Sequence, residues 1–244
     1  MKRPLFLLLF ILLNSFQHLS FAQTPEIDSL LTVIRTAKED TLKVNALNLL
    51  SKKVGWRIGN YDTAFYYAEN AKQLAEKLKF KKGIGDSHNN IGIIYQNQGN
   101  YPEALKNHFA SLNIREEIGD KTGVAMSYNG IGNVYVRQGK YPEALKNYFA
   151  SLKIREAIGD KLGIAGSYNN IGLIYADQGN YPAALKNYFA CLKIDKEIGD
   201  KSGMASSYNN IGNVYQSQGD YPEALKNHFA SLKLEEEMGK SSRE

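Results

Sequence analysis

IGNVYVRQGKYPEALKNYFASLKIREAIGDKLGIAGSYNN, residues 131–170, is followed directly by IGLIYADQGNYPAALKNYFACLKIDKEIGDKSGMASSYNN, residues 171–210. The two stretches are identical at 27 of 40 positions. Residues 91–130 match the same template, and residues 211–238 match its first part. Self-similarity at a fixed period of this length is the sequence signature of stacked repeats. We therefore expect a solenoid in which each unit contacts mainly its neighbours.

Each unit carries the start and stop signals of two helices. In one copy, Asp120 is placed to cap a first helix that runs to about Gln138, where Gly139 ends it. Pro142 then opens a second helix at a position where the missing N–H of proline costs nothing. This second helix has an apolar stripe at helical spacing: Ala144, Leu145, Tyr148, Phe149, Leu152 and Ile158. Only the next copy can cover the stripe, so its residues are expected in the core, as is Tyr135.

A glycine recurs on the first helix of every unit, at Gly92, Gly132, Gly172 and Gly212. Glycine inside a helix costs about 1 kcal/mol relative to alanine. Four such positions therefore predict that another helix approaches closely at this point.

The repeat resembles the tetratricopeptide signature, with Tyr128 in its tryptophan position, at these residues: Tyr128, Ile131, Gly132, Tyr135, Gly139, Tyr141, Ala144, Tyr148 and Ser151. The resemblance implies an all-α, right-handed α-solenoid of helical hairpins. The units are longer than the usual length of about 34 residues, and the chain is similar to exported bacterial repeat regions that precede sensor histidine kinases or helix-turn-helix regulators. The expected organisation is a signal peptide (1–22), an N-terminal helix (23–39), a degenerate repeat (40–82), four repeats (85–118, 125–158, 165–198 and 205–238) and a tail (239–244).

The first residues have the composition of a secretory signal peptide. Lys2 and Arg3 precede an unbroken apolar run at residues 5–13, and residues 20–22 place small side chains at the two positions that a signal peptidase reads. The alternative is a membrane anchor, but a span needs about 20 apolar residues and this run is shorter. We expect cleavage before Gln23, no membrane span in the mature chain, and a periplasmic or secreted location.

Composition and charge give no indication of nucleic-acid binding. Without Lys2 and Arg3 the chain has 28 basic and 25 acidic residues, and no run of five like charges occurs. A nucleic-acid-binding protein usually concentrates lysine and arginine on one face. We therefore expect no nucleic-acid partner.

No residue pattern of an active site, a metal site or a cofactor site is present. P-loop, G-x-S-x-G, H-E-x-x-H and C-x-x-C motifs do not occur. The remaining candidates for a catalytic or metal-binding role occupy positions that hold packing residues in other copies. His88, His108 and His228 stand where other copies have tyrosine, and Cys191 stands where they have serine. We therefore expect no catalytic residue, no metal and no cofactor, and interpret these side chains as packing.

Asparagines form a stripe on the first helix of each unit. At about 100° per residue, they lie on the side opposite the apolar residues, and the resemblance places this side along the concave groove. An amide both donates and accepts hydrogen bonds, which suits the main chain of an extended peptide. The expected peptide-binding residues are Asn89, Asn90, Asn129, Asn133, Arg137, Asn169, Asn170, Asp177, Asn209, Asn210 and Asn213. Of these, Asn129, Asn169 and Asn209 are expected to hold the main chain, and Asn133, Arg137 and Asp177 to select side chains.

These observations favour an exported, non-catalytic scaffold that binds a peptide or a partner helix in its groove. The alternative is the extracytoplasmic sensory region of a signalling receptor, either a histidine kinase or a transcription regulator. The last helix also carries apolar residues that no further repeat covers: Leu225, Phe229, Leu232, Leu234 and Met238. Because large exposed apolar patches usually mark interfaces, we expect either that the natural chain continues or that this face self-associates.

Overall fold

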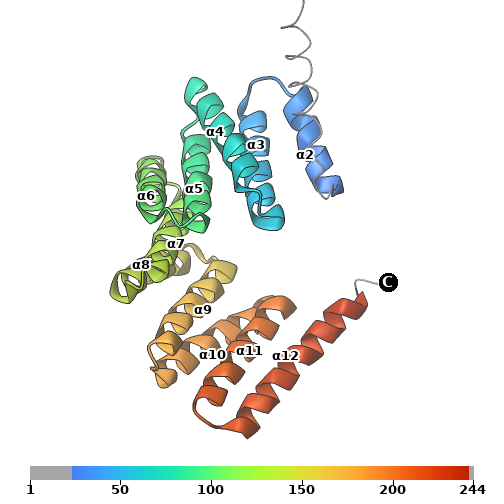
Figure 1. Ribbon diagram of the computed structural model, residues 1–244, viewed down its shortest axis with the longest axis vertical. Coiled ribbons are helices and arrows are strands. Elements are labelled where there is room, and N and C mark those ends of the chain that lie inside the picture. The colour runs from blue at the N-terminus through green and yellow to red at the C-terminus, as the bar shows by residue number, and fades with distance from the viewer. Residues whose placement is uncertain (1–23, 242–244) are drawn as a thin grey trace, which may run out of the picture. The chain divides into compact units, whose positions relative to one another are not determined.

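The computed structural model describes residues 24–241, and this part of the chain is helical, with no strand among the described residues (Figure 1). From residue 101 onward, helices that are consecutive in the chain pack against each other. The chain divides into two compact units, Met1–Ile94 and Tyr95–Glu244. None of the described helices combines the length and the apolar character that a membrane span requires. The signal peptide expected at residues 1–22 lies outside the described residues.

The first unit contains the helices that precede the regular repeats. They are α2 (Pro25–Thr36), α3 (Thr41–Lys53), a five-residue π-helix, η1 (Val54–Ile58), α4 (Tyr61–Lys77) and most of α5 (Lys81–Asn97). The side chains of Thr24, Asp40 and Asn60 cap α2, α3 and α4 by accepting from backbone N–H groups of the first turn. Buried alanines of α4 allow it to pack closely on α3, where the Ser51 hydroxyl donates to the backbone oxygen of Ala64 at 2.7 Å.

The second unit repeats one helical hairpin at the period predicted from the sequence. Its helices are α6 (Tyr101–Glu117), α7 (Lys121–Arg137), α8 (Tyr141–Ile158), α9 (Lys161–Asp177), α10 (Tyr181–Ile198), α11 (Lys201–Ser217) and α12 (Tyr221–Ser241). By their position in the sequence repeat, we call α5, α7, α9 and α11 helix A, and α6, α8, α10 and α12 helix B. Asp120 caps α7 and Pro142 lies in the first turn of α8, as predicted. Gly159 ends α8 with a φ of 71°, which favours glycine.

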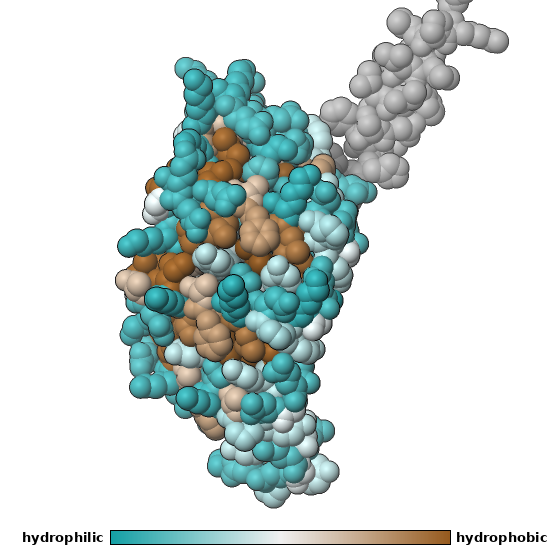
Figure 2. Space-filling view, turned by 90° about the vertical axis from the view of Figure 1, so that its left-hand side faces the viewer, coloured by the Kyte–Doolittle hydropathy of each residue, from teal (hydrophilic) through white to brown (hydrophobic). Residues whose placement is uncertain are grey.

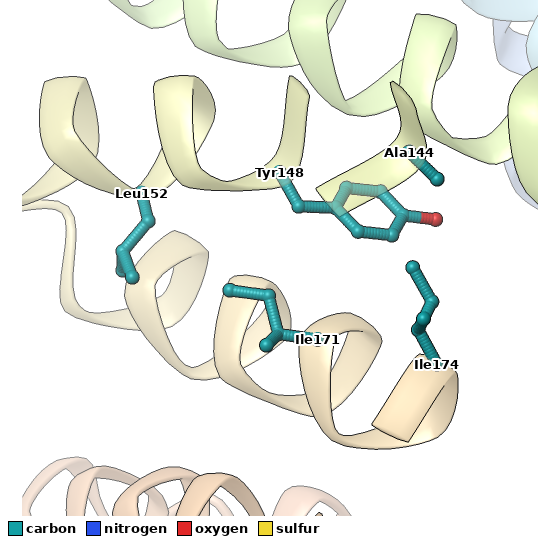
Figure 3. Close-up of a cluster of buried hydrophobic side chains, with 5 residues drawn as sticks. All are labelled: Ala144, Tyr148, Leu152, Ile171 and Ile174. Atoms are coloured by element: carbon teal, nitrogen blue, oxygen red, sulfur yellow. The ribbon is translucent and has the colours of Figure 1, made fainter. Parts of the chain in front are cut away.

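The core lies between helix B of one hairpin and helix A of the next. Tyr148 and Leu152 of α8 point toward Ile171 and Ile174 of α9 (Figure 3). The equivalent residues of α10 and α11 form the same cluster one repeat later. The recurring glycine makes room for the ring, because a Cβ on Gly132 would lie 2.6 Å from Cε1 of Tyr148. The close approach predicted from the helix-A glycines is therefore confirmed at this position.

One core prediction is wrong: Phe149 is 46% exposed, whereas the adjacent Tyr148 is 3% exposed. Consecutive residues of a helix are about 100° apart, and the direction toward α9 is occupied by Tyr148. Tyr135 is half-buried and packs against the cluster around Tyr148. The buried face of α8 is thus narrower than its apolar stripe.

Several apolar side chains of the last helix are exposed to solvent. Leu232 of α12 is 48% exposed, whereas the equivalent Leu152 and Leu192 are 7% and 5% exposed beneath the following helix A. Leu225 and Phe229 are also exposed. The self-association expected of this face stays a prediction.

Candidate functional site

Some positions beside the asparagines of helix A hold different residues in different repeats, and in the second unit they lie at the surface. Arg137 at the end of α7 and Asp177 at the end of α9 are exposed, as is Asn213 on α11. Leu173, one turn before Asp177, is 43% exposed. Each successive helix A therefore presents a different side chain at equivalent surface positions, as a surface that selects a ligand by its side chains would require.

A hollow of about 250 Å³ lies on this face of the second unit. It is lined by Leu173, Ala176 and Asp177 of α9, Tyr181 and Tyr188 of α10, and Asn210, Asn213, Val214 and Ser217 of α11. Three of the residues predicted from the sequence, Asp177, Asn210 and Asn213, are therefore brought together around one concave space. The lining combines apolar surface with amide, hydroxyl and carboxylate groups, the usual composition of a site that fixes a ligand by a few polar contacts.

The expected exposed position is wrong for Asn89 and Asn90. Asn89 is 6% exposed and Asn90 is 9% exposed. The side-chain N–H of Asn90 donates to the backbone oxygen of Asn48 at 2.9 Å and to its Oδ1 at 3.2 Å. Ser87 donates to the same Oδ1 at 3.0 Å. A buried amide needs such partners, so in the first unit Asn90 and Ser87 hold α5 to α3.

In the second unit, two asparagine pairs join consecutive repeats. Nδ2 of Asn170 donates to Oδ1 of Asn129 at 3.0 Å, and Nδ2 of Asn210 donates to Oδ1 of Asn169 at 2.9 Å. All four residues are half-buried. The side-chain oxygens of Asn129 and Asn169, which the sequence suggested would bind a peptide main chain, thus already accept a bond from the next repeat.

Two other predicted residues have partners within their own repeat. The hydroxyl of Tyr148 donates to Oδ1 of Asn133 at 2.6 Å. Burial raises the pKa of Tyr148, so this hydroxyl remains a donor at neutral pH. Asn209 is exposed, and its Oδ1 lies 3.2 Å from Nδ1 of His228. Asn133 is therefore held in place by the core, whereas the side-chain hydrogen bond of Asn209 is with the half-buried His228 of its own hairpin.

His108 and Cys191 lie where packing residues were expected. His108 is fully buried, and burial, together with nearby Arg115, lowers its pKa to about 4. Its ring rests on Gly130, where a Cβ would lie 2.6 Å from Cε1 of the imidazole. Burial also raises the pKa of the Cys191 thiol to about 12, which removes the thiolate that a nucleophile would need.

Two buried charged groups were missed in the sequence. Arg115 and Asp195 occupy equivalent positions two repeats apart, and each is 2% exposed. Nη1 of Arg115 donates to the backbone oxygen of Gly123 at 2.8 Å, whereas Oδ2 of Asp195 accepts from the Ser207 hydroxyl at 3.1 Å. The change from arginine at positions 115 and 155 to aspartate at position 195 of the same repeat site was the available signal.

Comparison with known proteins agrees with this architecture. The structure of BtubC (BKLC) from P. vanneervenii is similar over 89% of this chain and 93% of that chain, with a TM-score of 0.73 and 19% identity. A Rap protein complexed with Competence and Sporulation Factor is similar over 85% of this chain and 57% of that chain, with a TM-score of 0.72 and 14% identity.

A signal-transduction ATPase from Pyrococcus horikoshii with a tetratricopeptide-repeat sensor is similar over 87% of this chain and 36% of that chain, with a TM-score of 0.65 and 18% identity. At these identities the likeness shows the fold alone. No curated protein matches the sequence. The family model described as tetratricopeptide repeat matches residues 83–157 and 163–234, more than half of the chain. The chain therefore belongs to the tetratricopeptide-repeat family, whose fold typically serves as a protein-interaction scaffold.

Proposed function

We propose that the chain is an exported, non-catalytic scaffold that binds an extended peptide along the helix-A face of its second unit. The observation that carries the proposal is the hollow around Asp177, Asn210 and Asn213, three residues selected from the sequence. The Rap protein of similar fold, which was solved with a bound factor, supports the use of such a solenoid for binding.

The lining of the hollow indicates what it would accept. The exposed Leu173 and the partly buried Ala176 offer apolar contact next to the carboxylate of Asp177. Asn213 is exposed and supplies both a donor and an acceptor. The peptide that fits this combination has an apolar residue beside a basic one, with its main chain bonded to Asn213.

Selection from random peptides displayed on phage tests this proposal. Peptides enriched on the wild-type chain should bind Asn213→Ala about two- to tenfold more weakly, the loss expected for one hydrogen bond. Asp177→Lys should change the preferred residue from basic to acidic. Lys121→Ala on the exposed first turn of α7 is the control and should bind as the wild type does. Peptides that bind all three variants equally would show that the hollow is not the site.

Export is the second part of the proposal. It is supported by Lys2, Arg3, the apolar run at residues 5–13 and the small residues at 20 and 22. Expression in a Gram-negative host should give a periplasmic product that begins at Gln23. N-terminal sequencing that finds residues 1–22 intact would contradict the signal peptide and favour an anchor.

A sensory role is the other candidate function. It is favoured by the likeness to the signal-transduction ATPase, whose tetratricopeptide repeats are a sensor. If this chain has that role, ligands selected on the helix-A face should regulate an output domain encoded in the same reading frame. The genomic reading frame around the sequence decides between the two roles, since a scaffold needs no output domain.

A further inference from the structure

One phenylalanine on each helix B of the second unit remains open to solvent. Phe109, Phe149 and Phe189 are 41%, 46% and 46% exposed. The neighbouring Tyr148 and Tyr188 are almost fully buried. Since α9 packs on both α8 and α10 and still leaves Phe149 and Phe189 open, the core of the second unit makes little use of these rings. Apolar side chains gather in a patch with hydrophilic borders on the face drawn in Figure 2.

Lysines flank Phe149 and Phe189 on both sides. Lys146 and Lys153 lie three residues before and four residues after Phe149, and thus on the same face of α8. Lys186 and Lys193 have the same positions around Phe189 on α10. All four lysines are exposed. We call these six residues the Lys–Phe–Lys band.

The lysines of the band have no acidic partner among the described residues. This differs from the first and last repeats, where Lys106 and Lys226 pair with glutamates three residues earlier at 3.2 and 3.0 Å. In α10 the corresponding glutamate is replaced by Ala183. The middle of the unit therefore presents apolar rings between lysines that form no ion pair with any described residue.

The borders of the band indicate its width. On α8, the exposed Glu143 and Glu156 lie beyond the two lysines, so the face reads acidic, basic, apolar, basic, acidic along the helix. A flat anionic membrane would meet the outer carboxylates of α8 as well as the lysines, and like charges repel. On α10 the equivalent positions hold Ala183 and Lys196, so this repulsion is confined to α8. A narrow partner that lies across the helices would meet only the rings and the lysines.

From this arrangement we propose that the Lys–Phe–Lys band is a second docking surface, and that its occupant is an acidic amphipathic helix of another protein. Apolar residues of that helix rest on Phe149 and Phe189, and carboxylates on its two flanks meet the lysines. Amphipathic helices are commonly recognised by such apolar seams with complementary charge. The surface lies on helix B and does not use the helix-A hollow, so it does not depend on the proposed peptide site.

The test uses the full chain and a fluorescein-labelled model peptide of about 18 residues, with leucines along one helical face, glutamates on both flanks and alanines elsewhere. A second peptide has lysine in place of every glutamate. Two double variants remove the band: Phe149→Ser with Phe189→Ser, and Lys146→Glu with Lys186→Glu. The controls are Leu162→Ser, which removes another exposed apolar residue, and Lys82→Glu with Lys121→Glu, which changes the net charge equally.

We expect the acidic peptide to bind the wild-type chain and both controls, and the lysine peptide to bind none. Each band variant should weaken binding at least about tenfold while keeping its circular dichroism spectrum and melting temperature. Asn213→Ala should bind as the wild type does, which separates this surface from the hollow. The proposal is overturned if the wild type does not bind, or if the controls lose as much affinity as the band variants. It is also overturned if phosphatidylglycerol vesicles bind through Phe149 and Phe189 while the peptide does not.

Discussion

Replacing Asn129 with alanine removes a hydrogen bond between consecutive repeats. Its Oδ1 accepts from Nδ2 of Asn170 at 3.0 Å, and the same bond joins Asn169 to Asn210 at 2.9 Å. The net contribution of one such bond to stability is about 1 kcal/mol. Asn129→Ala and Asn169→Ala should therefore each lower the free energy of unfolding by about 1 kcal/mol.

Asn209 provides the matched control. It occupies the same repeat position but is exposed, and its contact is with His228 of its own hairpin. Surface substitutions usually change stability by no more than about 0.5 kcal/mol. Asn209→Ala should thus be close to neutral, although the substituted residue and its place in the repeat are the same.

Urea unfolding followed by circular dichroism measures these differences. A double-mutant cycle of Asn129→Ala and Asn170→Ala should give a coupling energy near 1 kcal/mol. Repeat proteins do not always unfold in one step. Hydrogen exchange of the α7 and α9 backbone amides should therefore be measured alongside urea unfolding, to report the local stability of these two helices. Equal effects of Asn129→Ala and Asn209→Ala, together with a coupling near zero, would refute the assigned inter-repeat bond.

Three further changes test packing and charge. Ile171→Ala, at a fully buried position, should cost about 2–5 kcal/mol by urea unfolding, whereas Phe149→Ala should cost less than about 1 kcal/mol; similar losses would contradict their assigned burial. Burial raises the pKa of Asp195. In the unfolded chain this carboxyl has the ordinary aspartate pKa of about 4, so the folded state loses stability relative to the unfolded state as the pH rises above that pKa. Asp195→Asn should accordingly match the wild type at acid pH and exceed it in melting temperature near pH 7, and a pH-independent difference would count against this. Leu232→Ser should reduce binding of a hydrophobic dye more than Leu192→Ser does when both variants remain folded, since only Leu232 is exposed.

The helix ends could be predicted because each carries its own signal in the sequence. Asp120 caps α7 and Pro142 lies in the first turn of α8. The forty-residue period repeats these signals, so an error at one copy would have been visible against the others. The glycine on helix A was also informative, because its cost to the helix demands a compensating contact, and the ring of Tyr148 is that contact for Gly132.

Burial within the apolar stripe could not be predicted in the same way. Tyr148 and Phe149 are adjacent, aromatic and repeated together, and only the position of α9 decides which one enters the core. Lys146 and Lys153 at helical spacing from Phe149 were the available signal, because they mark the solvent side of α8. An apolar pattern on one helix sets the upper limit of its buried face, and the neighbouring helices set the actual width.

The asparagine stripe shows the same limit and changes how the peptide site must be tested. A helical wheel treats one helix alone, so it could not pair Asn129 with Asn170, which follows 41 residues later in the next repeat. An asparagine that recurs in every copy can serve the bond between repeats instead of a ligand. Alanine at Asn129 or Asn169 would remove both the inter-repeat bond and any hydrogen bond to a peptide, so its effect could not be assigned to either. Within residues 24–241, Asn213 has no such link to another repeat, and it lines the hollow. Loss of peptide binding in Asn213→Ala, at unchanged stability, would therefore assign the amide to the ligand, which no variant of the linked pairs can do.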